Sequence, residues 1–329
     1  MRIALFGDIH LFSLALAPWH MFSKRVLGQT NLWLNRRTRF HVHLLEQMCE
    51  RIETIGPDLV LSPGDLTTTA LHSEFRLARG AISDVLERQQ FFVVPGNHDR
   101  YTFKADREKR FEQYFGEFTT TDWPIRRTLA EGVELIGVDA SRPNLIFDRG
   151  QIGDQQMARL DRMLSELPAG SRVLMLCHYT LGAPPGYKRE SRMHNLIEQM
   201  PLRRMLADAG HPTLYLHGHV HRPWCWRVAD CPNVLAVNAG SPTHVDATYP
   251  HGQGIWQIDL PEGAAPEADP PANNSREAGD ADGDPGPGPG PWRLTHHLPL
   301  SDTNWQATPI TPPRRPGTAV ELTGPVAEQ

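Results

Sequence analysis

The chain has 329 residues, of which 40% are hydrophobic and 22% charged, and its formal charge is −5 at pH 7. At about 150 residues per domain this length predicts one or two domains, and the hydrophobic content excludes wholesale disorder. A dedicated duplex nucleic-acid binder needs a basic surplus, so we expect no stable nucleic-acid partner. The four cysteines form no Cys-x-x-Cys pair, which argues against a thiolate zinc site. Neither a signal peptide nor an apolar run of about 18 residues is found, which predicts a cytoplasmic protein.

Short apolar runs alternate with amphipathic stretches over the first two thirds of the chain. Helical spacing of apolar residues predicts helices over 40–55, where Phe40 and Ile55 lie near one face, and over 151–167. After residue 216 the pattern changes to strand after strand. We therefore expect an α/β part followed by an all-β part, with strands at 3–6, 59–61, 91–94, 135–138, 173–176, 214–216, 224–228, 234–237, 255–260 and 292–298.

Residues 261–291 have a composition unlike the rest of the chain. They include eight prolines, six glycines and seven acidic residues against one base, Arg276. Such a stretch cannot bury apolar surface, so we predict a disordered loop. The strands on either side of it predict a hairpin whose turn is replaced by this loop, an insertion that loop-closure entropy tolerates. The predicted organisation is a folded domain over 1–300 and a flexible tail over 301–329.

Polar residues follow five of the predicted strands. In α/β folds, ligands bind outside the carboxyl ends of the strands, and carboxylates, carboxamides and imidazoles together suit a divalent metal of borderline hardness. An isolated Asp-x-His or Gly-Asp after a strand is usually a turn or a cap. Taken together, however, the whole series predicts a metal site, and its members are Asp8, His10, Asp65, Asn97, His98, Asp99, His178, His219 and His221.

This series resembles the calcineurin-like metallophosphoesterase family over about 260 residues from the N-terminus, as far as its five motif blocks extend. The run from Gly96 to Asp99, Gly-Asn-His-Asp, is similar to the phosphodiesterase branch. The resemblance implies a two-sheet β-sandwich flanked by helices, of the α/β class, with a dinuclear centre of two divalent metal ions (Mn, Fe, Co, Ni or Zn). It further implies that Asp65 bridges the two ions, one held by Asp8, His10 and His221 and the other by Asn97, His178 and His219.

The function that the resemblance implies is hydrolysis of a small phosphate ester, most readily a phosphodiester. Two ions about 3.5–4 Å apart hold a bridging hydroxide, which attacks in line, and bind the phosphoryl oxygens. A carboxylate such as Asp65 has two oxygens for bridging, and the neutral Asn97 limits the negative charge. His98 is then the proton donor to the leaving oxygen, oriented by a carboxylate such as Asp99.

Residues 11–39 form an insertion beside Asp8 and His10 that is apolar in its first half and basic in its second. One interpretation is a helical pair with a solvated basic face. The other is a lid that contacts an anionic membrane surface, at the inner face of the membrane.

The membrane interpretation suits an alternative function, the hydrolysis of the pyrophosphate of a lipid-linked nucleotide such as UDP-2,3-diacylglucosamine. A related branch of the family cleaves that substrate but carries Arg at the position of His98. A non-catalytic scaffold is a third interpretation, which is disfavoured because scaffolds tend to lose ligands and every ligand is present here.

Overall fold

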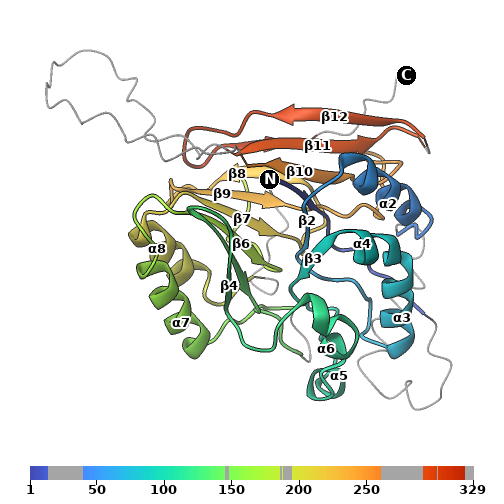
Figure 1. Cartoon of the computed structure of the whole chain (residues 1–329), viewed down its shortest axis with the longest axis horizontal. Helices are drawn as coiled ribbons and strands as arrows, with labels where there is room; N and C mark the ends of the chain where they lie inside the picture. The colour runs from blue at the N-terminus through green and yellow to red at the C-terminus, as the bar shows by residue number, and fades with distance from the viewer. Residues whose placement is uncertain are drawn as a thin grey trace, which may run out of the picture.

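Two β-sheets lie at the centre of the computed structural model, which describes residues 1–13, 40–144, 148–185, 187, 195–260, 292–301 and 303–322 (Figure 1). Most of the insertion at 11–39 and the whole loop at 261–291 lie outside these residues. The first sheet has the strand order β12-β11-β10-β1-β2-β3. Its strands are β1 (Arg2–Leu5), β2 (Leu59–Ser62), β3 (Gln90–Val93), β10 (Ile255–Asp259), β11 (Arg293–Pro299) and β12 (Trp305–Ile310).

The second sheet has the strand order β13-β8-β9-β7-β6-β5-β4. In each sheet the central strands are parallel: β1, β2 and β3 in the first sheet and β5, β6, β7 and β9 in the second. Their carboxyl ends therefore lie at one edge of each sheet. The strands of the second sheet are β4 (Ile125–Ala130), β5 (Val133–Val138), β6 (Arg172–Cys177), β7 (Thr213–His217), β8 (Trp224–Arg227), β9 (Val234–Asn238) and β13 (Ala319–Glu321).

Helices cover the outer faces of the two sheets (Figure 1). Beside the first sheet are α2 (Leu44–Ile55), α3 (His72–Ala81), α4 (Ser83–Arg88), α5 (Phe103–Arg107), α6 (Arg110–Phe115) and the short 3-10 helix η3 (Gly116–Phe118). Beside the second are α7 (Asp154–Ser165) and α8 (Gln199–Ala209). None of the helices in the described ranges has the length and apolar composition to span a membrane.

Alternation along the strands divides the core into three layers. In β1, Ile3 and Leu5 face the second sheet, whereas Ala4 packs with the helices on the outer side. In β6, Leu174 and Leu176 face the first sheet and Val173 faces α7 and α8. Because both faces of each central strand are buried, these strands consist of unbroken apolar runs, the pattern by which the sequence predicts them. The predicted two-sheet fold flanked by helices is confirmed.

The predicted hairpin is present, because β10 and β11 pair antiparallel up to Asp259↔Arg293. The prediction of a flexible tail over 301–329 is wrong for the residues of this segment that the structure describes, 301 and 303–322. β12 pairs with β11 from Leu294↔Ile310 to Pro299↔Trp305, and β13 pairs with β8. These are edge strands held by backbone hydrogen bonds, which need little apolar sequence, and in β12 only Ile310 is buried.

The start of the first predicted helix also differs from the expectation. Helix α2 begins at Leu44, and Phe40 forms an isolated antiparallel bridge with His244. The ring of Phe40 packs edge-on against His10, with the ring centroids 4.9 Å apart. Its burial comes from this contact with the strand ends and not from the core face of a helix.

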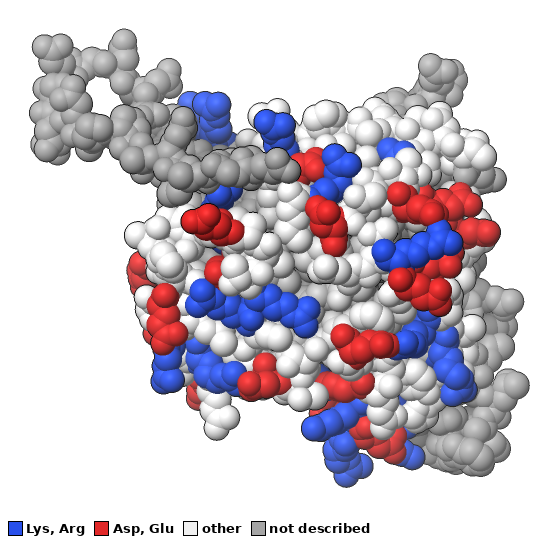
Figure 2. Space-filling model, in the orientation of Figure 1, with Lys and Arg blue, Asp and Glu red and all other residues white. Residues whose placement is uncertain are grey.

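On the one face that Figure 2 shows, charged residues of both signs lie interspersed over the helices and strands. Ion pairs such as Arg2 with Asp259, at 2.8 Å, join neighbouring strands. The charge imbalance of the sequence is concentrated in residues 261–291, as the composition indicates.

Candidate metal centre

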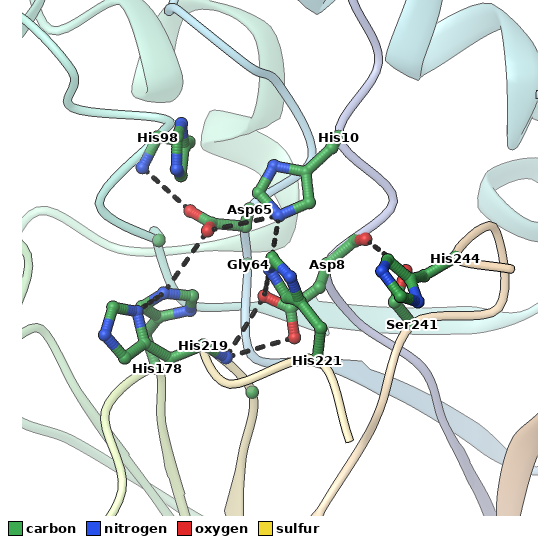
Figure 3. A network of polar contacts seen from close by, with 12 residues as sticks. Asp8, His10, Gly64, Asp65, His98, His178, His219, His221, Ser241 and His244 are labelled. Atoms are coloured by element: carbon green, nitrogen blue, oxygen red, sulfur yellow. Dashed lines mark hydrogen bonds and ion pairs between the residues drawn. The ribbon is translucent and has the colours of Figure 1, made fainter. Parts of the chain in front are cut away.

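The residues predicted as metal ligands stand at the carboxyl ends of strands in both sheets. Asp8 and His10 follow β1, Asp65 follows β2 and Asn97 follows β3, while His178 follows β6. His219 and His221 come directly after β7. The structure brings all seven predicted ligands to one place, and six of them are labelled in Figure 3; the seventh, Asn97, lies within 3.0 Å of His178 and His219.

The backbone at these positions is strained. Among the described residues, seven that are not glycine have a positive φ, and five of the seven are predicted ligands. A residue other than glycine in this region costs about 1–3 kcal/mol, and such residues cluster at functional sites. Asp and His tolerate this conformation better than most side chains. The five are Asp8 (φ 54°), His10 (φ 48°), Asp65 (φ 54°), His219 (φ 75°) and His221 (φ 50°).

One group of side chains gathers around His10. Asp8, His10, Asp65 and His221 each present a ligand atom, and these four atoms all lie within 4.8 Å of one another. Nε2 of His10 is 2.7 Å from Nε2 of His221 and 3.6 Å from Oδ2 of Asp65. Nε2 of His221 lies 3.8 Å from Oδ1 of Asp8. Such separations are those of donors around one ion with bonds of about 2.0–2.2 Å.

A second group gathers around Asn97. Its Oδ1 is 2.9 Å from Nε2 of His178 and 3.0 Å from Nδ1 of His219. The two imidazole nitrogens are 3.2 Å apart. The side chains are those that the family pattern assigns to the second ion.

Asp65 stands between the two groups. Its Oδ2 is 3.6 Å from Nε2 of His10 and 3.5 Å from Nε2 of His178. Its Oδ1 accepts a hydrogen bond of 2.8 Å from the backbone N–H of His98, which fixes the carboxylate (Figure 3). A Cβ at Gly96 would lie 2.1 Å from that Oδ1, so only glycine fits there. One carboxylate oxygen is thus directed at both groups of side chains.

The protonation state of His178 indicates that the two groups of side chains suit a bound cation. Nδ1 of His178 lies 2.8 Å from the carbonyl of Pro63, which can only accept, so Nδ1 carries the proton and Nε2 has a lone pair. Burial lowers the pKa of His178 to about 3, which keeps the ring neutral. The Nε2 lone pair therefore faces two other acceptors, Oδ1 of Asn97 and Oδ2 of Asp65. A cation between these facing acceptors would stabilise them, and this donor set of imidazole, carboxylate and carboxamide suits a divalent transition metal.

His98 lies beside the first group. Its ring packs edge-on against His10, with centroids 4.8 Å apart, and stacks on Tyr101 at 5.5 Å. Nδ1 of His98 donates to the carbonyl of Thr68 at 2.6 Å, so Nε2 can take up and release a proton while the ring stays fixed.

The expectation that Asp99 orients His98 is wrong. The Asp99 carboxylate is buried and accepts hydrogen bonds from Thr67, by N–H and hydroxyl, and from the N–H groups of Gly96 and Leu66. Burial raises the pKa of Asp99, while these bonds lower it. Because both oxygens are used in this way, Asp99 shapes the loops after β2 and β3, and a backbone carbonyl orients His98 instead.

Three residues that the sequence did not assign to the site hold it together. Oγ of Ser241 donates to the carbonyl of Asp8 at 2.7 Å and so joins the end of β9 to the end of β1. Gln253 donates from Nε2 to the carbonyl of His221 at 2.8 Å and to Nδ1 of His244 at 3.0 Å. Phe40 packs between His10 and His244. The short polar run Ser-Pro-Thr, separated from the end of β9 by two residues, was the available signal for Ser241.

Comparisons with known proteins agree with this geometry. The family profile of the calcineurin-like phosphoesterases matches residues 1–223. A probable glycerophosphodiester phosphodiesterase, GpdQ, of Arcobacter nitrofigilis is 28% identical over 201 residues, which are 57% of this chain and 64% of that protein. The match therefore spans just under two thirds of the relative.

Solved structures share the fold at low identity. PhoD aligns with a TM-score of 0.58 at 9% identity, covering 100% of this chain and 72% of that one. A dimetal phosphatase from Danio rerio aligns with a TM-score of 0.54 at 14% identity, covering 79% and 93%. A purple acid phosphatase from yellow lupin, PPD1, aligns with a TM-score of 0.53 at 13% identity, covering 78% of this chain and 48% of that one.

The sheet order and the strand-end groups of side chains agree with the profile match. The chain belongs to the calcineurin-like phosphoesterase family.

Proposed function

We propose that this protein is a dinuclear metal phosphodiesterase acting on a small diester. Asp8, His10 and His221 hold one metal ion, Asn97, His178 and His219 hold the other, and Asp65 is shared between them. The observation that supports this most directly is the position of Asp65 Oδ2, 3.6 Å from the first group and 3.5 Å from the second.

The two ions, when bound, supply a nucleophile at neutral pH and positive charge for the phosphoryl oxygens. The chain supplies the rest. His98, held through Nδ1 by the Thr68 carbonyl, delivers a proton from Nε2 to the leaving oxygen. Phe40 and Tyr101 flank the imidazoles of His10 and His98 and fix their planes.

The test is an assay of protein loaded with each divalent metal in turn. The substrates are a glycerophosphodiester, a cyclic nucleotide, bis-p-nitrophenyl phosphate, a phosphate monoester and a lipid-linked UDP-sugar. We expect turnover of a diester at a ratio of two metal ions per chain. Full activity at one ion per chain would contradict the dinuclear assignment. Turnover of the monoester alone would contradict the proposal that the substrate is a phosphodiester.

Five points of this proposal come from the sequence. The identity of the metals, the phosphodiesterase branch and the cytoplasmic location are predictions from composition and motifs. The membrane surface and the lipid-linked substrate are predictions from residues 11–39, most of which lie outside the described residues. The lipid-linked UDP-sugar in the assay distinguishes the second function from the first.

A further inference from the structure

Tyr179 contacts two of the side chains assigned to the second ion. It follows His178 at the end of β6 and is fully buried. Its ring centroid lies 4.5 Å from that of His219 and 5.2 Å from that of His178, edge-on to the latter. A Cβ at Gly150 would lie 2.5 Å from the ring, so the backbone at residue 150 holds the ring against the imidazoles.

Among the residues that the structure describes, the buried hydroxyl of Tyr179 has no hydrogen-bond partner. A buried hydroxyl without a partner costs about 1–3 kcal/mol, which a phenylalanine at this position would avoid. Tyr215, on the neighbouring strand β7, shows the usual arrangement. It is equally buried, and its hydroxyl donates to the carbonyl of Tyr179 at 2.7 Å. The hydrogen bond of the Tyr179 hydroxyl is therefore not used by any described residue and is available to a bound ligand.

The phenol of Tyr179 carries one O–H group, which can donate a hydrogen bond to an oxygen acceptor. The two imidazoles that its ring contacts, those of His178 and His219, are both assigned to the second ion.

We propose that Tyr179 is a positioning residue for the second metal position. Its ring fixes the imidazoles of His178 and His219, and its hydroxyl donates a hydrogen bond to an oxygen ligand bound there, either water or a phosphoryl group. This inference rests on the proposed dinuclear site, which gives the two imidazoles their role.

The ring is tested with Tyr179→Leu in protein loaded with Co²⁺, whose visible absorption and stoichiometry report each ion separately. We expect bound cobalt to fall from two ions per chain towards one, because the ring contacts His178 and His219, two of the side chains assigned to the second ion. Tyr179→Phe should restore two ions. Tyr215→Leu, which removes the same volume from the same core, should retain both ions and separates this effect from general loss of packing.

The hydroxyl is tested with Tyr179→Phe and inorganic phosphate as the probe. Loss of one hydrogen bond to a phosphoryl oxygen should weaken phosphate binding about 3- to 10-fold. If the partner is water, phosphate affinity stays the same but the cobalt spectrum changes in the absence of phosphate. An unchanged spectrum together with unchanged phosphate affinity would show that the hydroxyl has no such role.

The outcomes separate this inference from the proposed function. If Tyr179→Leu and Tyr215→Leu both retain two cobalt ions while the wild type hydrolyses diesters, the ring has no positioning role and the function stands. If the wild type hydrolyses no diester but Tyr179→Leu loses one ion, the function fails and the positioning role stands.

Discussion

The two sheet edges contribute different chemistry to the site. The first edge supplies all the oxygen donors, Asp8, Asp65 and Asn97, and these are buried. The second edge supplies only imidazoles, and two of them, His219 and His221, are partly exposed. For the pair of His221 and Asp8, the exposed fraction of the side chains is 21% against 0%.

The difference indicates how an anionic substrate approaches. Negative charge is kept behind the ligand atoms, where backbone N–H groups hold it: that of His98 on Asp65, and that of His219 on both oxygens of Asp8. The partly exposed rings, those of His98, His219 and His221, are neutral or positive. Under the proposed function, a phosphate ester would meet imidazoles and the bound metal ions before it meets a carboxylate, which lowers the repulsion between site and substrate.

Asp65 lies next to ligand groups from both sheet edges, so its replacement should have the largest effect on metal content and turnover. Asp65→Ala should lower the content of both ions and reduce turnover by more than the roughly 100-fold that removing an outer partner of a ligand costs. Metal analysis and diester kinetics measure this. Glu134→Gln on β5, a buried carboxylate that pairs with Arg126 far from the ions, is the control. Loss of one ion only would assign Asp65 to a single position.

His98 sharpens the comparison because it lies on the first edge and is not assigned as a ligand. His98→Ala should keep both ions and slow turnover by about 10²–10⁴-fold, the usual contribution of a general acid. The loss should be large for alkyl or sugar leaving groups and small for p-nitrophenolate, which leaves readily without a proton. A variant that loses metal would make His98 a ligand. Equal losses for both leaving groups would mean that it binds the phosphoryl oxygens.

The residues that sequence could predict are those whose chemistry is local. Unbroken apolar runs in the sequence predict the strands that are buried on both faces. Asp8, Asp65 and His178 could be recognised because each is a polar residue just after such a run. The partners of these residues could not be predicted. Whether Thr68 or Asp99 orients His98 depends on how two loops distant in sequence meet, and the edge strand β12 is held by backbone bonds that leave no pattern in side chains.

Two glycines show how closely the first edge is packed. A Cβ at Gly96 would lie 2.1 Å from Oδ1 of Asp65, so Gly96→Ala should displace the shared carboxylate and reduce metal content and activity. Gly80, in α3, has no atom within 4 Å of the same position. Gly80→Ala should therefore raise the free energy of unfolding by about 0.5–1 kcal/mol and leave activity unchanged. Equal behaviour of the two variants in metal analysis and thermal unfolding would contradict this account of the edge.

His296, on β11, tests what burial does to a histidine outside both edges. Burial lowers its pKa from 6.5 to about 3, so below pH 6.5 the unfolded chain takes up a proton that the folded chain refuses. This group therefore destabilises the fold as the pH falls, by about 2 kcal/mol between pH 7 and pH 5. In urea unfolding at the two pH values, His296→Leu should remove that difference. His43→Leu, at an exposed position, should not, and an unchanged pH dependence in the first variant would place the proton elsewhere.

The smallest effect is expected at the far end of the first sheet, away from both ligand edges. β10 and β11 pair in register up to Asp259↔Arg293, so the hairpin is complete without residues 262–290. Replacing those residues by a short Asn-Gly turn should leave folding, metal content and turnover unchanged, because Asn-Gly favours the turn that two antiparallel strands require. The acidic, Pro- and Gly-rich composition of this stretch offers little apolar surface for packing on the sheet. Thermal unfolding, metal analysis and diester kinetics of the shortened chain measure the outcome. Loss of activity with an intact fold would mean that these acidic residues reach the metal centre, and the division of charge between the two edges would then have to include them.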